Sequence, residues 1–411
     1  MKVLWLVQNP MNFKKGYNGG GWISSLQRLL HNSQPDLSLT IAYWGQNSTK
    51  SEEDGVAYYE MQEPKMSKLK KLSYRLRGDY VNEEESEWPA YRKELETVVR
   101  EISPDIIHIF GSESRNGLIS GHTSVPVVIH IQGILNPYLN SYLPPFVSKR
   151  DYNLKDGLNP RKIMKNYFQF YNWEKMTHCE REILRNTKYY LGRTEWDYRL
   201  TCLFNPQAVY FHCDEVLRES FYIADVKREY PTKLKIVSTI SIPPYKGYDV
   251  VLKTAKLLKS LDVDFEWTVF GNVQPSLMEK KFGIKHEDVN VRLYGVASQE
   301  QIKEQLLSST VYVHPSYIDN SPNSVCEAQM CKLPVIAANV GGVCSMVENE
   351  KTGYLVPAND PYQTAYLIMH LFKNKDVAER IADNAYQCAI ARHDKNKIVQ
   401  QLLSAYNKML S

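Results

Sequence analysis

The chain lacks the features that mark a secreted, membrane-spanning or nucleic-acid-binding protein. Its seven cysteines are scattered and form no Cys-x-x-Cys pair, which argues against a disulfide framework or a structural zinc site and favours a reducing cytoplasm. The opening MKVLWLVQNP is apolar for too few residues to form a signal-peptide core, and no apolar run approaches the roughly 20 residues of a membrane span. The formal net charge is only +4, so we expect no nucleic acid among the partners.

What is present is an alternation of short β-branched runs with helix-like segments. A chain of 411 residues is long enough for two domains. The runs before a polar stretch at 224–233 are KVLWLVQ, LTIAYW, DIIHIFGS, PVVIHIQGI, KYYLGRT and AVYFH, and those after it are KIVSTI, FEWTVFGN, VNVRLYG, TVYVHPS and LPVIAAN. Such alternation is typical of parallel α/β sheets. We predict an N-terminal domain over 1–220 and a C-terminal domain over 221–392, with an amphipathic tail helix at about 393–411 that packs back on the first domain.

Two segments are rich in cations and aromatic residues. Residues 65–77 carry six cations and no acid. The six are Lys65, Lys68, Lys70, Lys71, Arg75 and Arg77. Because leucine and tyrosine are interleaved with them, the pattern fits either a solvated helix face or a contact with an anionic membrane surface. Residues 141–170 are compatible with an acceptor site or with a packed surface loop.

Residues that directly follow strands are the first functional candidates, because open parallel sheets bind ligands beyond the carboxyl ends of their strands. The glycines of NGGGWISSL (Gly19 to Gly21) follow the first strand, and they either let a phosphate approach a helix start or form a tight turn. Lys246, in PPYKGYDVV, follows the first strand of the second half. It is either a diphosphate-binding cation or a solvated lysine at a helix start.

The segment HPSYIDNSPNSVCEA (314–328) places two carboxylates, Asp319 and Glu327, on either side of a small polar loop. We predict that a helix follows the loop, with the backbone of 321–325 at its N-terminus and Glu327 in its first turn. Free N–H groups at that end favour an anion. Glu327 can accept two hydrogen bonds from a ribose, although an acid in a first turn is also a common stabilising feature without a function.

This ordered set of motifs resembles the retaining glycosyltransferases of family 4, which have the GT-B fold. The similarity is strongest over 314–361, which contains Gly341, Gly342 and TGYLVP, and PDIIHIFG, PVVIHIQG, NGGGW and YKGYD stand in the family's order. The resemblance implies an α/β fold with two Rossmann-like domains facing a central cleft. It also implies a nucleotide-diphospho-sugar donor held mainly by the second domain, with no metal and no separate cofactor. The acidic DVD at 262–264 is expected to lie in a loop before a strand.

The resemblance also assigns roles to residues. Glu327 would hold the ribose hydroxyls and Asp319 those of the donor sugar, while Lys246 and the 321–325 amides would hold the diphosphate. The predicted donor-binding residues are Gly20, Gly21, Arg193, Lys246, Gly295, Asp319, Ser321, Pro322, Asn323, Ser324, Val325 and Glu327. The predicted catalytic residues are Asp319, Lys246, Glu327 and Gln132.

The chain departs from the family pattern at three places. Asp319 stands where the family usually has a glutamate. STISIPPYKG lacks the arginine that usually comes about five residues before the Lys-Gly, and we predict that Arg193 replaces it from across the cleft. Gln132 aligns with a common histidine, and we predict that Gln132 faces the cleft while His130 is packed.

The leading hypothesis is a retaining, metal-independent glycosyltransferase that works at the cytoplasmic membrane face. It would move a hexosyl unit from a nucleotide-sugar, with UDP as the favoured nucleotide, to a glycan or lipid-linked acceptor in bacterial surface polysaccharide biosynthesis. The missing arginine and Gln132 leave open a catalytically degenerate sugar-binding or scaffold subunit. A nucleotide-sugar 2-epimerase is a third reading, but it needs a first-domain carboxylate partner that the sequence does not indicate.

Overall fold

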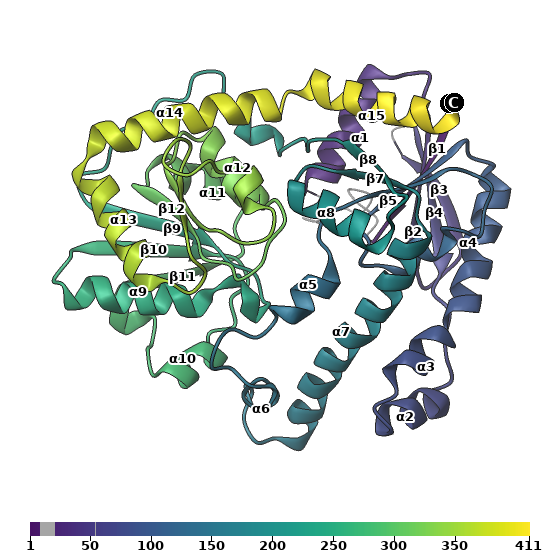
Figure 1. The fold of residues 1–411 in the computed structure, drawn as a ribbon, viewed down its shortest axis with the longest axis horizontal. Helices are drawn as coiled ribbons and strands as arrows, with labels where there is room; N and C mark the ends of the chain where they lie inside the picture. The colour runs from purple at the N-terminus through teal and green to yellow at the C-terminus, as the bar shows by residue number, and fades with distance from the viewer. Residues whose placement is uncertain (9–20, 54) are drawn as a thin grey trace. The chain divides into compact units, whose positions relative to one another are not determined.

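The computed structural model describes residues 1–8, 21–53 and 55–411, which divide into two compact units (Figure 1). Unit 1 comprises Met1–Leu139, Phe168–Val216 and His393–Ser411, and unit 2 comprises Asn140–Tyr167 and Leu217–Arg392. Both units are mixtures of helices and largely parallel sheet, so the predicted α/β fold class is confirmed.

Unit 1 is built on an eight-stranded sheet of order β3-β4-β2-β1-β5-β6-β7-β8. The strands are β1 Lys2–Val7, β2 Ser38–Gly45, β3 Thr49–Glu53, β4 Val56–Gln62, β5 Ile106–Phe110, β6 Val127–His130, β7 Tyr189–Gly192 and β8 Val209–His212. The central strands β5 and β6 are buried along their whole length. Their near-continuous apolar runs are what a parallel sheet covered on both faces requires.

The helices of unit 1 connect and cover these strands. They are α1 Gly21–Ser33, α2 Lys68–Leu76, α3 Tyr80–Glu85, α4 Trp88–Ile102, α5 Leu135–Asn140, α8 Glu195–Phe204 and α15 Lys395–Leu410, with a 3₁₀ turn at Arg115–Ile119. The long helix α7, Pro160–Asn186, carries the chain from unit 2 back into unit 1.

The C-terminal helix α15 spans the amphipathic tail that the sequence predicts as helical, and this prediction is confirmed. Its Tyr406 is fully buried in unit 1. The Tyr406 hydroxyl lies 2.6 Å from Nδ1 of His108 and accepts a hydrogen bond from the Trp5 indole at 3.3 Å. The chain end is therefore part of the core of unit 1.

Unit 2 contains a six-stranded sheet of order β11-β10-β9-β12-β13-β14, in which the recorded strand pairs are parallel. Its strands are β9 Leu234–Thr239, β10 Phe265–Phe270, β11 Val291–Gly295, β12 Val311–His314, β13 Val335–Ala338 and β14 Tyr354–Val356. Its helices are α6 Lys149–Asn153, α9 Tyr248–Ser260, α10 Ser276–Phe282, α11 Gln299–Leu307, α12 Asn323–Met330, α13 Pro361–Lys373 and α14 Lys375–Arg392, with 3₁₀ turns at Glu219–Phe221, Pro244–Lys246, Glu287–Val289 and Val343–Ser345.

The segment 140–167 packs with unit 2, whereas the sequence placed it in the N-terminal domain. The rings of Tyr142 and Tyr245 lie 5.9 Å apart, and the Tyr142 and Tyr152 hydroxyls are 3.2 Å apart. Lys281 adds an ion pair with Asp151 at 2.9 Å. The contacts with Tyr245 and Lys281 join residues far apart in the chain, so local sequence patterns do not reveal them.

Within the described residues, no helix is both long enough and apolar enough to cross a bilayer.

Candidate functional site

The strongest cluster of predicted residues lies at the carboxyl ends of β9 and β12 in unit 2. These strands are parallel neighbours, so the loops that follow them meet at one edge of the sheet. Nζ of Lys246, in the turn after β9, lies 2.7 Å from Oδ2 of Asp319, in the loop after β12. The backbone N–H of Tyr317 donates to the carbonyl of Tyr245 at 2.7 Å, which ties the two loops together.

Two glycines allow these loops to approach so closely. Gly247 has φ +78°, and a side chain there would overlap the carbonyl of Pro315. Gly341 has φ +52°, and a side chain there would overlap the carbonyl of Asp319, which also accepts a hydrogen bond from the Gly342 N–H at 3.0 Å. Only glycine combines this backbone conformation with the required space.

Asp319 is buried, with 6% of its surface exposed, and is held as a carboxylate. Burial alone would raise its pKa, but the Lys246 ammonium and the His314 ring bring the pKa well below its usual range. Nε2 of His314 lies 3.2 Å from Oδ2, and the Asn320 N–H donates to Oδ1 at 3.1 Å. Asp319 and Lys246 thus form a preorganised charged pair at the sheet edge.

The second predicted carboxylate, Glu327, makes a bidentate ion pair with Arg218. Nε and Nη2 of Arg218 each donate to one carboxylate oxygen at 2.7 Å. Burial raises the pKa of Glu327, and the Arg218 guanidinium works in the opposite direction. A carboxylate has about four acceptor positions, so Glu327 can still accept hydrogen bonds from two hydroxyl groups while the pair is intact.

Sequence reasoning missed Arg218. It lies in CDEVLRESFY, a segment interpreted only as a domain boundary, and 109 positions separate it from its partner. No periodic or motif signal marks it, although an arginine beside a buried acid is a pairing that charge considerations favour.

The helix start after Asp319 differs from the prediction. Helix α12 begins at Asn323, with Pro322 as its N-cap. Glu327 therefore lies in the second turn and not the first. Pro322 has no N–H to offer, and the Val325 N–H already donates to the Pro322 carbonyl at 3.0 Å. Asn323 and Ser324 stand in the first turn, where a helix leaves N–H groups without intrahelical acceptors.

Gly295 ends β11, the edge strand of the same sheet, and has φ +85°. Its carbonyl accepts a hydrogen bond from the Gly271 N–H at 2.8 Å, in the loop after β10. Because the strands are parallel, the carboxyl ends of β9, β10, β11 and β12 lie at the same end of the sheet. The predicted unit 2 residues lie along this end.

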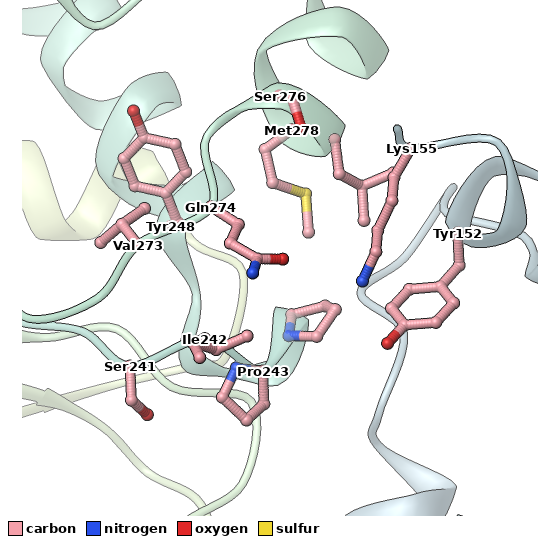
Figure 2. A pocket seen from close by; sticks show the side chains of 12 residues that line it. Tyr152, Lys155, Ser241, Ile242, Pro243, Tyr248, Val273, Gln274, Ser276 and Met278 are labelled. Atoms are coloured by element: carbon pink, nitrogen blue, oxygen red, sulfur yellow. The ribbon is translucent and has the colours of Figure 1, made fainter. Parts of the chain in front are cut away.

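A pocket of unit 2 adjoins the 3₁₀ turn that carries Lys246 (Figure 2). Its cavity volume is about 30 Å³. Its lining residues are Tyr152, Lys155, Ser241, Ile242, Pro243, Pro244, Tyr248, Val273, Gln274, Ser276, Leu277 and Met278. Lys155 extends into the pocket from the 140–167 segment, with Nζ 4.0 Å from the centre of the Tyr152 ring. Among these described lining residues it is the only Lys or Arg, and the pocket also includes Ser241, where the expected arginine is missing.

The predicted residues of unit 1 are less closely associated with one another. Helix α1 begins at Gly21, as the glycine cluster predicts, whereas Gly20 lies outside the described residues. Gln132 is half-buried two residues beyond β6. His130 is fully buried against Trp22, with ring centroids 4.9 Å apart, which confirms that it is a packed residue.

Arg193 follows β7, but the residue is only 7% exposed and its guanidinium forms an ion pair with the buried Glu215. Its guanidinium also lies 5.8 Å from the Trp22 ring centre. The charge of Arg193 is therefore balanced within unit 1, and its role toward a donor stays a prediction.

The acidic DVD sequence lies between α9 and β10, as predicted for a loop. Asp264 pairs with Lys233 at 3.5 Å. In the part of the chain that the structure describes, no group of three or more His, Cys, Asp or Glu side chains is arranged to hold a metal ion.

Comparison with known proteins agrees with this architecture. Residues 223–388 match the family model described as "Glycosyl transferases group 1". The chain is 27% identical over 148 residues to the amylovoran biosynthesis glycosyltransferase AmsK of Erwinia amylovora, an alignment that covers 34% of this chain and 36% of that protein. The aligned segment thus spans about a third of the length of this curated relative.

Solved structures resemble the chain over its whole length. A sucrose-phosphate synthase from Thermosynechococcus elongatus superposes with a TM-score of 0.68 at 14% identity, covering 100% of this chain and 99% of the other. HepE from Anabaena, solved in complex with UDP and glucose, superposes with a TM-score of 0.65 at 14% identity, covering 99% and 100%. The chain therefore has the GT-B fold, and within it residues 223–388 are similar to the glycosyl transferases group 1 family.

Proposed function

We propose that this protein is a retaining glycosyltransferase that needs no metal ion and transfers a hexosyl unit from a nucleotide-diphospho-sugar. The observation that carries the proposal is the placement of Lys246, Asp319 and Glu327 in loops and a helix that follow neighbouring parallel strands. That edge is where open α/β sheets bind ligands. The group 1 match of the same region supports a glycosyl donor as the ligand.

Lys246 is the residue we propose to offset the diphosphate charge. Its ammonium has three donors, so it can keep its hydrogen bond to Asp319 and still donate to a phosphate oxygen. Asp319, ionised and held in place, would then accept a hydrogen bond from a hydroxyl of the donor sugar. The pair would align the sugar with the leaving group before the reaction, which is the main electrostatic and orientational contribution available here.

The proposed reaction breaks the bond between the anomeric carbon and the diphosphate oxygen. The leaving oxygen takes the proton of the acceptor hydroxyl, and the acceptor oxygen bonds to the anomeric carbon on the same face. No protein nucleophile is required. Removal of the Lys246 charge should therefore slow departure of the diphosphate, by about a hundredfold for a lost electrostatic contact of this kind.

The choice of donor and acceptor follows from the relatives. HepE is described in complex with UDP and glucose, which supports a UDP-sugar donor. AmsK is described as an amylovoran biosynthesis enzyme, which supports a glycan or lipid-linked acceptor in bacterial surface polysaccharide assembly. We propose a cytoplasmic location because the scattered cysteines lack the pairing pattern of a disulfide framework.

A donor screen tests the proposal. The protein is incubated with UDP-, GDP- and ADP-sugars in the presence of EDTA, and nucleoside diphosphate release and thermal stabilisation are measured in parallel. We expect one donor to stabilise the protein and to be consumed, with consumption reduced in Lys246→Gln. The matched control is Lys332→Gln, which removes a lysine paired with Asp383 at 3.0 Å elsewhere in unit 2 and should behave like the wild type.

A catalytically degenerate sugar-binding subunit is the second candidate. It is favoured by the charge balance of Arg193 with Glu215 and by Ser241 in place of the expected arginine. It predicts thermal stabilisation by a nucleotide-sugar without any release, even with lipid-extract acceptors. Absence of stabilisation by every donor would contradict both candidates.

A further inference from the structure

Helix α2 presents a stripe of leucines to solvent. Leu69 is 83% exposed, Leu72 48% and Leu76 75%, and none of the nine residues of the helix is buried. The spacing of three and four residues places the three leucines on one face. Isolated exposed leucines are ordinary on protein surfaces, but three on one face of one short helix form a continuous apolar strip.

Cations stand on both sides of this strip. With 3.6 residues per turn, Lys68 and Arg75 fall along one side of the leucines, and Lys70 and Arg77 fall along the other. The surrounding segment 65–77 contains six cations and no acid. The helix thus has an apolar centre between two positively charged borders.

The rest of α2 is attached to unit 1. Nε of Arg75 lies 3.6 Å from Oε1 of the buried Glu83, and its guanidinium lies 4.8 Å from the centre of the Phe168 ring. The Ser67 hydroxyl caps the helix by accepting from the Lys70 N–H at 3.3 Å. The helix is therefore held on α3 and α7 with its leucines outward. Figure 1 shows α2 at the end of the α4, α3 and α2 series, away from the sheet of its own unit.

We propose that α2 docks unit 1 on the surface of an anionic phospholipid bilayer. The leucines would enter the boundary between headgroups and acyl chains, and the flanking cations would contact the headgroup phosphates, as amphipathic helices that lie in the interface plane do. The inference stands on α2 alone and does not depend on the donor site, although it suits a lipid-linked acceptor.

The arrangement favours a bilayer over other polyanions. A nucleic acid would satisfy the cations but leave the leucines in water, and neutral lipid would accept the leucines without using the cations. A bilayer with anionic headgroups uses both, because its apolar layer lies directly beneath a layer of negative charge.

Vesicle flotation tests the inference with the full-length protein. The vesicles contain either phosphatidylcholine alone or phosphatidylcholine with phosphatidylglycerol. We expect the wild type to float with the anionic vesicles and not with the neutral ones. Leu69→Ser/Leu76→Ser should weaken this partitioning by about tenfold or more, because two large apolar side chains leave the lipid. Lys68→Gln/Lys70→Gln/Arg77→Gln should weaken it by about fivefold for each cation at low salt.

Matched controls separate the helix from general effects. Leu203→Ser removes a leucine of α8 that is 71% exposed in the same unit, and Lys93→Gln removes an exposed cation of α4. Both should float like the wild type. All variants should release nucleoside diphosphate from the soluble donor at the wild-type rate, so loss of flotation is distinguishable from failure of the donor site.

Three results would overturn the inference. One is equal binding of the wild type to neutral and anionic vesicles, which would mean that the cations do not contribute. No binding to either kind of vesicle at low salt would likewise contradict it and would leave an acidic protein surface as the partner to seek. The third is full flotation of the leucine variant alongside loss in the cation variant, which would mean that the protein only adsorbs electrostatically and that the leucines do not enter the bilayer.

Discussion

Nζ of Lys246 and Oδ2 of Asp319 lie 2.7 Å apart, although 73 positions separate the two residues in the chain. The pair exists because β9 and β12 are parallel neighbours whose following loops meet, and because Gly247 and Gly341 let those loops touch. The cation that we propose to bind the diphosphate is thus held in position by a carboxylate.

The pair should give the protein a characteristic sensitivity to acid. Burial tends to raise the pKa of Asp319, but Lys246 and His314 lower it below its usual range. A carboxylate whose pKa is depressed on folding stabilises the fold above the ordinary aspartate pKa of about 3.9, and this stabilisation is lost as the pH falls toward the folded value. We expect the free energy of unfolding to decrease between about pH 4 and pH 2 more steeply in the wild type than in Asp319→Asn.

Denaturant unfolding at several pH values measures this difference. The matched control is Asp383→Asn, whose carboxylate is 60% exposed beside Lys332 and should leave the pH dependence unchanged. Identical slopes for the wild type and Asp319→Asn would contradict the electrostatic role given to the pair.

Removing one partner of the ion pair between Arg218 and Glu327 should lower the free energy of unfolding more than removing both partners. Arg218→Met leaves Glu327, which is 5% exposed, without its cation. Because the Arg218 side chain is 28% exposed, we expect a loss of about 1–3 kcal/mol in the free energy of unfolding, less than for a fully buried pair. The double variant Arg218→Met/Glu327→Gln should be more stable than Arg218→Met, since no uncompensated charge remains.

A double-mutant cycle by denaturant unfolding gives the coupling directly. Additive effects of Arg218→Met and Glu327→Gln would show that the observed hydrogen bonds contribute nothing to stability. Donor affinity measured on Arg218→Lys, which keeps the charge but loses the fork geometry, reports separately on whether the carboxylate must be held in this orientation.

Lys155 and Arg193 are the two candidates for the second cation that we propose to contact the diphosphate. Lys155 extends into the pocket that contains Ser241, whereas Arg193 is already paired with Glu215. If Lys155 takes the place of the missing arginine, Lys155→Gln should lower kcat/KM by roughly ten- to a hundredfold, and Ser241→Arg in that background should restore part of it. Arg193→Lys, which keeps the balancing charge, should then have nearly wild-type activity.

Steady-state kinetics with the donor identified in the screen decides between them. Lys281→Gln is the control for Lys155→Gln, because it removes another lysine that contacts the 140–167 segment, through Asp151. A wild-type rate for Lys155→Gln together with a large loss for Arg193→Lys would assign the role to Arg193 instead.

Much of the fold could be predicted because its strands are locally distinctive. Runs such as IIHIF and VYVH are mostly apolar, since both faces of a parallel sheet are covered, and each forms a strand that is buried along its whole length. The edge strand β3, TKSEE, escaped prediction because all five residues are exposed and only pairing with β4 makes them extended. The three-residue β14 is likewise too short to carry a pattern.

Some residues of the candidate site could also be predicted from the sequence, and others could not. Asp319, Glu327 and Lys246 could be named from the sequence, because carboxylates and a lysine directly after apolar runs are visible in the linear order. The start of α12 at Asn323, the ion pair from Arg218 and the presence of Lys155 and Ser241 in one pocket could not. The sequence by itself determined which short-range patterns become strands and helices. The tertiary structure decided which distant charges balance one another, because that pairing depends on strand order and loop packing and not on local spacing.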